Sequence, residues 1–321
     1  MNLNFNPMRL FSIFVLVAAI GFSGCEKVIY LEVETQENKL VVNTTLAPGD
    51  YASSRVTLSA DPLALSFDGL GVSDATVTIT RNGNTSFVLD NYGDGAYGLE
   101  PEAHLVEPGD ALTMTVTAPG KDPVEASTTI PNLVPITSVQ ILDTTYKTYS
   151  YSSVDPDGNI VIIDTLIPYY QIELIFTDPE ESNQYGLTIL YEDAVFTVNA
   201  CFTTSNPIFG LDNSWVSNNL EENGEVTICD EIRFPDYANN GQEIRIVVDV
   251  FAIETLFATE PKFKFVLSNL SDEYYSYLAS SMLQEGSNGD PFSEPVVVYS
   301  NIQGGFGIFA GFTKSIAEIA L

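Results

Sequence analysis

The feature that most limits how this 321-residue chain can fold is an alternation of apolar residues with threonine. It is clearest in residues 75–80 (Ala-Thr-Val-Thr-Ile-Thr) and 112–117 (Leu-Thr-Met-Thr-Val-Thr). A period of two residues places one set of side chains inward and the other toward water, which predicts half-buried β-strands. Turn-forming sequences separate such stretches; they are Asn82-Gly83-Asn84, Gly93-Asp94-Gly95, Pro108-Gly109-Asp110, Pro119-Gly120 and Asp157-Gly158.

Short strands at this spacing predict an all-β chain made of sandwiches or barrels. We expect an N-terminal immunoglobulin-like β-sandwich over residues 40–132. A larger β-sandwich or barrel-like domain is expected to follow over residues 133–321, with the junction at Pro131-Asn132-Leu133-Val134-Pro135. Long strand candidates in the second domain are residues 169–176, 185–191 and 244–253.

One short helix is expected in the second domain, near residues 272–285. Ser271 is a favourable N-cap, and Asp272 and Glu273 complement the positive end of the helix dipole. Gly286 is the expected C-terminal stop. The expected buried face consists of Tyr275, Leu278 and Met282, and Leu270 is expected to pack on Tyr275. We expect this helix to cover an open end or a face of the second sheet.

The first 24 residues have the pattern of a secretory signal. Arg9 precedes an apolar run over residues 10–22, and the small residues Ser23 and Gly24 follow it. The run is shorter than the ~20 apolar residues of a membrane span. Cys25 comes next, so the end of the segment resembles a lipobox, where a bacterial transferase attaches a diacylglycerol to the thiol. We expect cleavage before Cys25 and a lipid-anchored tether over residues 25–39; the alternative is a plain signal peptide with a chance cysteine.

The chain is strongly acidic, with a formal net charge of −31. Such a surface repels phosphate backbones, so nucleic acid is not an expected partner. It also repels anionic headgroups, so acyl chains rather than a basic patch would hold the protein to the membrane. Between Lys147 and Arg233 there is no Lys or Arg. This acidic stretch has two interpretations: solubility of an exported β-rich protein, or a face that attracts cations.

Cys201 and Cys229 remain after Cys25. An even pair outside the cytoplasm predicts a disulfide. Two buried free thiols or a metal site are the alternatives. The metal site is disfavoured, because the single histidine, His104, is far away in sequence and no C-x-x-C pair is present.

No catalytic constellation can be identified, so we expect a protein that is not an enzyme and has no catalytic residues, metal or cofactor. His104 is interpreted as a surface-loop residue, and no G-x-S-x-G elbow accompanies it. Residues 155–159 (Asp-Pro-Asp-Gly-Asn) open like a calcium loop but lack its later ligands, so a hairpin turn between residues 149–154 and 160–165 is expected. Carboxylate-pair chemistry stays open. The glycine-rich residues 304–307 are expected to permit a bulge or close strand packing.

The stretch between Thr203 and Asn223 is rich in Asn and Ser and contains Phe209 and Trp215. Long loops on a rigid scaffold often carry binding sites. Phe209 and Trp215 are therefore candidate binding residues. A packed loop with a buried Trp215 is the alternative.

Several motifs resemble the lipoproteins of the domain-of-unknown-function-4249 family. They are Leu40-Val41-Val42-Asn43, Ser73-Asp74-Ala75-Thr76-Val77-Thr78-Ile79, Gly95-Ala96-Tyr97, Leu267-Ser268-Asn269-Leu270-Ser271-Asp272-Glu273-Tyr274-Tyr275, Asp290-Pro291-Phe292, Pro295, Asn301-Ile302 and Gly305-Phe306-Gly307-Ile308-Phe309. The resemblance implies an outer-membrane lipoprotein whose gene often neighbours a TonB-dependent transporter, and it implies no catalytic residues. Acidic residues after the lipidated cysteine favour display at the cell surface in such proteins; Glu26 fits this rule and Lys27 does not.

The expected function is therefore a non-enzymatic binding or accessory subunit at the cell surface. It would be held to the outer membrane by its lipid and would associate with a TonB-dependent transporter in nutrient uptake. The alternative is a structural or adhesive surface lipoprotein without a transport role. An extracellular hydrolase is a third, more distant possibility.

Replacing the lipid-acceptor thiol tests the anchor directly. Cys25→Ser is expected to block lipidation and to release the protein from membranes, because the acyl chains supply its membrane affinity. Membrane fractionation and mass spectrometry of the mature N-terminus measure this. A wild-type protein that is soluble and unmodified at its N-terminus would contradict the prediction.

Overall fold

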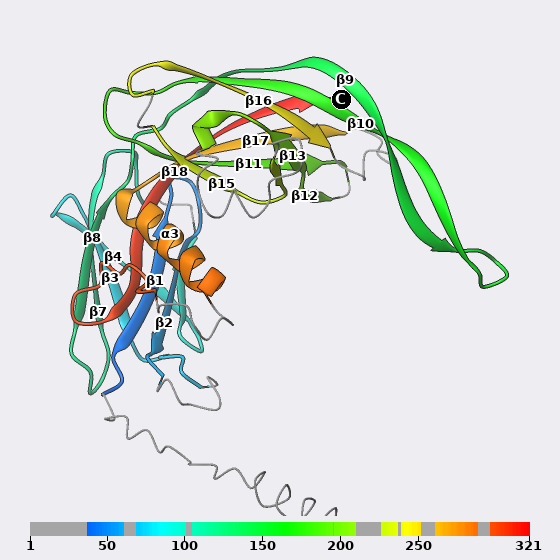
Figure 1. Cartoon of the computed structure of the whole chain (residues 1–321). Coiled ribbons are helices and arrows are strands. Elements are labelled where there is room, and N and C mark those ends of the chain that lie inside the picture. The colour runs from blue at the N-terminus through cyan, green and yellow to red at the C-terminus, as the bar shows by residue number, and fades with distance from the viewer. Residues whose placement is uncertain are drawn as a thin grey trace, which may run out of the picture. The chain divides into compact units, whose positions relative to one another are not determined.

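The structure is a computed structural model, and its strands form three hydrogen-bonded sheets (Figure 1). It describes residues 37–60, 69–100, 105–194, 196–209, 226–236, 239–251, 261–287 and 296–321. The signal segment, Cys25, His104 and Trp215 lie outside the described residues. In the described part of the chain, no helix is long and apolar enough to cross a membrane.

The N-terminal part of the chain forms two sheets that face each other across one core. Its strands are β1 (Leu40–Leu46), β2 (Ala52–Leu58), β3 (Thr76–Arg81), β4 (Thr85–Val88), β5 (Asp90–Gly93), β6 (Ala96–Leu99), β7 (Ala111–Thr117) and β8 (Val124–Thr129). One sheet has the order β4-β3-β7-β8, and the other contains β1-β2-β6-β5. The predicted alternation is confirmed, because Val77, Leu112 and Met114 are fully buried while the intervening Thr113 is exposed.

The second part of the chain forms a larger pair of sheets. Its elements are β9 (Ile136–Val154), β10 (Ile160–Thr177), β11 (Gln184–Glu192), β12 (Thr197–Asn199), β13 (Cys201–Thr204), the short 3₁₀ helix η2 (Pro207–Phe209), β14 (Val226–Ile228), β15 (Ile232–Pro235), β16 (Glu243–Phe251), β17 (Lys262–Leu270), α3 (Asp272–Ser287) and β18 (Phe306–Ala320). One sheet has the order β14-β13-β16-β10-β9. Strands β12, β11 and β17, with β15 paired to β11, lie across a second apolar core. These sheets confirm the all-β fold with a single α-helix in the described residues.

Strand β18 belongs to both halves. Its first part, from Phe306 to Gly311, pairs parallel with β1, and its second part, from Phe312 to Ala320, pairs antiparallel with β17. Phe309 on β18 is buried in the first core. The N-terminal sandwich is thus completed by the end of the chain, which a boundary after residue 132 did not anticipate. Asn38–Leu321 form one compact unit.

The helix begins where the sequence predicted and ends slightly later. The backbone N–H of Tyr274 donates to Ser271 Oγ at 3.3 Å, which confirms the N-cap. Gly286 lies inside α3 and does not end it. The Tyr274 ring lies 5.7 Å from the Phe312 ring, and Thr128 donates to Glu273 at 3.1 Å. The helix therefore packs on the shared strand β18 and reaches β8, rather than covering only the second sheet.

The glycine-rich segment before β18 allows two backbones to approach closely, as predicted. A Cβ at Gly305 would collide with the Leu40 carbonyl oxygen, and one at Gly307 with the Val42 carbonyl oxygen. Gly307 also has a φ of +107°, a conformation that L side chains rarely adopt. Glycine at position 307 is therefore required for the parallel pairing of β18 with β1.

Gly307→Ala is expected to destabilise the protein by about 2–4 kcal/mol, because it adds backbone strain and overpacking at the β1–β18 pair. Urea unfolding followed by circular dichroism measures the loss. Gly286→Ala is the matched control: it is helical, a Cβ there meets nothing within 4 Å, and alanine favours a helix. A Gly307→Ala protein as stable as the control would contradict the assignment.

Candidate functional site

The junction between the two halves is held by hydrogen bonds to a single linker residue. The Asn132 carbonyl oxygen accepts from Asn269 Nδ2 at 3.0 Å and from Thr313 Oγ1 at 3.1 Å. The Asn132 side chain donates to Glu181 at 2.9 Å. The linker predicted at residues 131–135 is therefore fixed to β17, to β18 and to the loop that precedes β11.

A buried polar network continues from this linker into the second core. Asn269 Nδ2 also donates to Asn183 Oδ1 at 2.8 Å, and the Asn183 backbone N–H donates to Asp236 at 2.8 Å. Tyr185 donates through its hydroxyl to Asp178, which also accepts from the Gly241 backbone N–H at 2.9 Å. Buried polar groups stabilise a fold only when they are hydrogen-bonded. The network thus fixes the loops around β11 with definite geometry.

Burial dominates the electrostatics of this network. Desolvation raises the pKa of Asp178, although the hydrogen bond from Tyr185 acts in the opposite direction. Desolvation and the nearby Asp178 also raise the pKa of Tyr185 well above its ordinary value. Tyr185 therefore stays protonated and serves as a hydrogen-bond donor.

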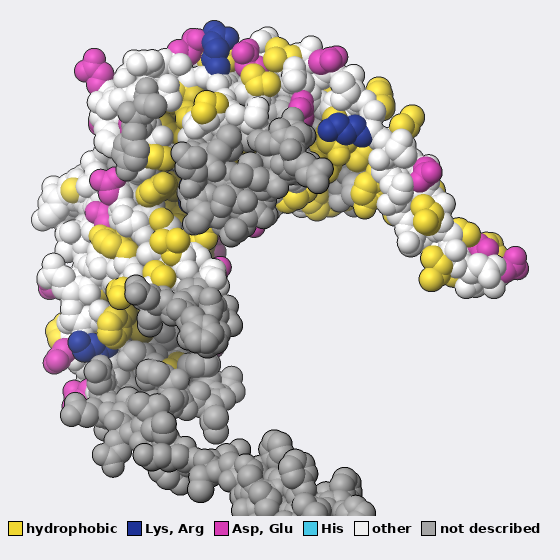
Figure 2. Space-filling model, viewed as in Figure 1, with side chains coloured by type: hydrophobic (Ala, Val, Ile, Leu, Met, Phe, Trp, Pro, Cys, Tyr) yellow, Lys and Arg dark blue, Asp and Glu magenta, His cyan; other side chains and the backbone are white. Residues whose placement is uncertain are grey.

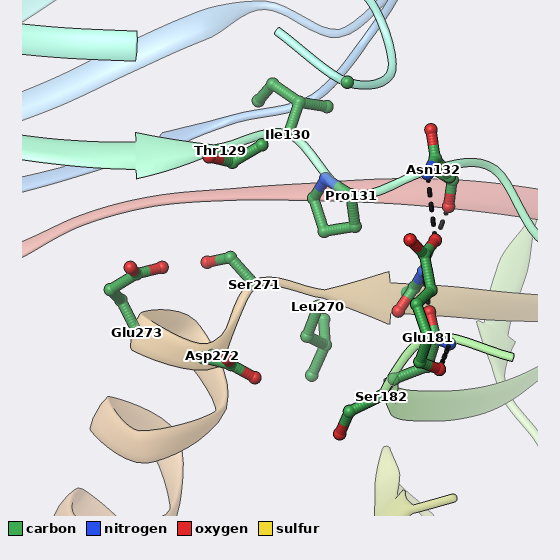
Figure 3. A pocket seen from close by; sticks show the side chains of 13 residues that line it. Thr129, Ile130, Pro131, Asn132, Glu181, Ser182, Leu270, Ser271, Asp272 and Glu273 are labelled. Atoms are coloured by element: carbon green, nitrogen blue, oxygen red, sulfur yellow. Dashed lines mark hydrogen bonds between the residues drawn. The ribbon is translucent and has the colours of Figure 1, made fainter. Parts of the chain in front are cut away.

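A small cleft opens beside the junction (Figure 3). Asp272 and Glu273 lie at the start of α3, and Glu181 lies on the opposite side with its hydrogen bond to Asn132. The cleft has a volume of about 280 Å³, whereas ligand pockets commonly measure ~300–1,000 Å³ and are mostly apolar. Its lining of carboxylates, amides and hydroxyls suits water or a small cationic group. We interpret the cleft mainly as the solvated edge of the junction.

The disulfide between Cys201 and Cys229 is confirmed, with an S–S distance of 1.98 Å. It links β13 to the residue after β14, two strands that also pair with each other. The two cysteines are 28 residues apart in sequence. A crosslink over a loop of this length stabilises a fold by roughly 3.5 kcal/mol in the chain-entropy model. The bond therefore crosslinks two neighbouring strands of the sheet that contains β10.

The candidate binding residue Phe209 is a core residue instead. It is buried in η2, and its ring packs edge-on against Phe234 at 5.2 Å. Burying an aromatic side chain is favourable and leaves no surface for a partner, so the prediction for Phe209 is wrong. Trp215 lies outside the described residues, and its role stays a prediction. Within the described residues, no three or more His, Cys, Asp or Glu side chains converge in a way that could hold a metal.

The structure also reveals a surface that the sequence analysis missed. In the described residues, β10 pairs with β16 from Tyr170 onward, whereas it pairs with β9 from Ile160. Residues 144–169 thus form a two-stranded extension beyond the sheet, which we call the arm; it projects past the other strands in Figure 1. The predicted turn over residues 155–159 lies at its tip, where Asp155 accepts from the backbone N–H groups of Asp157 and Asn159. These hydrogen bonds, led by that of Asn159, lower the pKa of Asp155.

The arm carries many apolar side chains for so exposed a structure, and Figure 2 shows hydrophobic side chains along it with acidic ones near the tip. Its large exposed apolar residues are Tyr146, Tyr149, Tyr151, Val154, Ile160, Ile162, Ile163 and Leu166. The run Ile160-Val161-Ile162-Ile163 is apolar on both faces, a pattern typical of a strand covered on both sides. Within the described ranges this run has one neighbouring strand, β9, so its pattern could have indicated a binding surface.

The fold places the chain among all-β sandwich proteins, and its sequence places it in a family. The chain belongs to the domain-of-unknown-function DUF4249 family, whose model matches residues 26–316. No curated protein matches the chain. The crystal structure of the collagen adhesin CNA from S. aureus is 8% identical, with 88% of this chain and 94% of that chain covered, at a TM-score of 0.16.

Asp178 provides a pH test of the buried network. Because its pKa in the folded protein is raised above the ordinary value of 3.8, the folded state binds more protons than the unfolded state just above that pH. The contribution of Asp178 to the free energy of unfolding is then full at lower pH and is lost as the pH rises through the folded pKa.

The stability advantage of the wild type over Asp178→Asn is therefore expected to shrink as the pH rises from about 3.8, as measured by urea unfolding at a series of pH values. Tyr185→Phe is the companion variant. It removes the hydroxyl whose hydrogen bond lowers the pKa of Asp178, so that pKa rises further. The loss of the Asp178 contribution to the free energy of unfolding should then extend to higher pH. An advantage of the wild type over Asp178→Asn that grows with pH would contradict this account.

Proposed function

We propose that this protein is a lipid-anchored, surface-exposed accessory subunit of the outer membrane. It binds a TonB-dependent transporter and has no catalytic activity of its own. The observation that carries the proposal is the arm, residues 144–169, which leaves the sheet and exposes apolar side chains. The expected anchor at Cys25 and the expected link of the family to transporter genes supply the membrane context.

The arm supports a binding function because its exposure is costly without a partner. An isolated two-stranded ribbon is marginally stable in water. Long exposed apolar strands with free edges also invite aggregation. Contiguous exposed apolar surface commonly marks sites of protein–protein interaction. A partner that covers the arm would remove both liabilities.

The anchor makes a modest interface sufficient. A lipid on Cys25 would confine the protein to the same membrane plane as an integral partner. Confinement raises the effective concentration of the two proteins, so their association needs less intrinsic affinity. The buried polar network at the junction holds the linker that leads into β9 against β17 and the loop before β11.

Purification of the tagged full-length lipoprotein from detergent-solubilised outer membranes tests the proposal. We expect a TonB-dependent transporter to co-purify in roughly equal amount, because the two proteins would form a stoichiometric complex. Cys25→Ser is the matched control: the interface is unchanged but the membrane confinement is lost, so recovery of the transporter should fall.

Two outcomes would contradict the proposal. Recovery of the lipoprotein alone, from membranes in which the transporter is abundant, would favour the structural or adhesive alternative. Equal recovery of the transporter with Cys25→Ser and with the wild type would show that the anchor does not assist association.

A further inference from the structure

The two faces of the arm can be distinguished by strand register. Residues directly opposite in an antiparallel pair lie on the same face. Ile160 lies opposite Val154, Ile162 opposite Ser152, and Leu166 opposite Thr148. Pro168 lies opposite Tyr146 on the same face. We define the apolar stripe as the large exposed side chains on this face: Tyr146, Val154, Ile160, Ile162 and Leu166.

The other face of the arm is packed by its own neighbours. The rings of Tyr149 and Tyr151 stack at 6.2 Å. Lys147 lies over the ring of Tyr169 at 4.1 Å, and that ring stacks on Phe251 at 4.6 Å. Exposure reflects the difference. It is 59% to 77% for the apolar stripe, but 37% to 41% for Tyr149, Tyr151 and Ile163 on the packed face.

The apolar stripe continues the core-facing side of β10. Side chains two residues apart lie on one face of a strand, and Ile172, Leu174 and Phe176 follow the register of Ile160 and Ile162. These three residues are fully buried in the second core. The stripe is thus a core-type face without a covering layer among the described residues.

We propose that the apolar stripe is the docking surface of this protein and inserts into an apolar groove, rimmed by basic residues, on an integral membrane protein. This inference deepens the proposed function and rests on it. The stripe is apolar, so we expect the groove that receives it to be lined with apolar side chains. The basic groups follow from charge: the arm carries Asp155 and Asp157 at its tip and Asp164 on the face of the stripe, opposite Ser150, against the single cation Lys147. Complementary charges around an apolar contact steer association and fix register.

Charge also disfavours a second copy of this chain as the occupant. Two copies would each bring a formal net charge of −31, and two acidic arms would face each other. Like charges placed together at an interface disfavour a partner. A partner with basic groups near the arm avoids this repulsion.

Lipid is disfavoured by the ends and edges of the arm. Asp155 and Asp157 lie in the turn at its tip, so insertion would remove carboxylates from water. Among the residues that the structure describes, β9 is an edge of its sheet and residues 160–168 of β10 pair with β9 alone. An open edge exposes unpaired backbone groups, which hydrocarbon cannot satisfy. A protein groove can supply hydrogen bonds to the carboxylates at the tip and to the backbone groups of the open edge.

The arm has a suitable length for such a contact. Residues 144–154 are eleven residues, which span roughly 36 Å at about 3.3 Å per residue. A stable interface buries about 800 Å² on each partner, which is roughly 30 Å across. A groove of ordinary interface size could therefore hold the arm along most of its length.

Adjacent residues on opposite faces provide a matched test. A photo-cross-linking amino acid is placed at position 162 or at position 163 of the full-length lipidated protein, and adducts are formed in intact outer membranes. We expect position 162 to give an adduct with an integral membrane protein at least tenfold more efficiently than position 163. Mass spectrometry should map the adduct to a partner surface that contains Lys or Arg.

Substitutions at the same two positions complete the test. Ile162→Ser is expected to reduce recovery of the co-purified transporter at least tenfold, and Ile163→Ser to leave it near the wild-type level. Thermal unfolding of both variants should match the wild type, because both side chains are exposed. Reduced recovery at unchanged thermal stability supports docking through the stripe.

The outcomes separate this inference from the proposed function. Wild-type recovery of a transporter, unaffected by Ile162→Ser, would overturn the docking surface and leave the proposed function standing. Failure of the wild type to recover a transporter would overturn the proposed function. In that case the adduct at position 162 alone tests whether the apolar stripe docks on an integral membrane protein. An adduct with a second copy of the chain overturns the inference. So does binding of Cys25→Ser protein to phosphatidylethanolamine–phosphatidylglycerol vesicles that is lost with Ile162→Ser.

Discussion

The double pairing of β18 is the constraint on which the rest of the structure depends. One strand gives six residues to a parallel ladder with β1 and nine to an antiparallel ladder with β17. Phe309 enters the first core from this strand, and Ile319 packs on the second. Because both halves share a strand, neither can complete its sheet without the last residues of the chain. The linker through Asn132 adds hydrogen bonds to β17 and β18 at the same place.

This shared frame explains how the arm can project without other support in the described structure. The base of β10 is buried in the second core, and its bulged ladder with β9 runs from that core to the tip. The disulfide between Cys201 and Cys229 adds a covalent link at β13, which pairs with β16 beside β10. A binding element gains affinity when it is held in its bound geometry beforehand. Rigid support at one end and exposed apolar surface at the other are consistent with a docking role.

Local patterns predicted the elements of this fold well, and pairings distant in sequence could not be predicted. Alternation identified the strands around Val77 and Met114, Ser271 identified the start of the helix, and the cysteine count identified the disulfide. The pairing of β18 with β1 joins residues more than 250 positions apart, and no local period encodes it. The arm could not be predicted for the same reason, because alternation along β10 does not show at which residue its pairing with β16 starts. Phe209 was misplaced because an aromatic residue in a polar stretch looks alike whether it is a contact or a core anchor.

Native-state hydrogen exchange over a series of urea concentrations tests the central claim most directly, namely that β18 couples the two halves into one cooperative unit. Amides in β7 report on the first core and amides in β16 on the second, and neither strand pairs with β18. Elements of one cooperative unit lose protection with the same free energy of opening. The account predicts that β7 and β16 lose protection together. Persistent protection of either strand after the other has exchanged would contradict it.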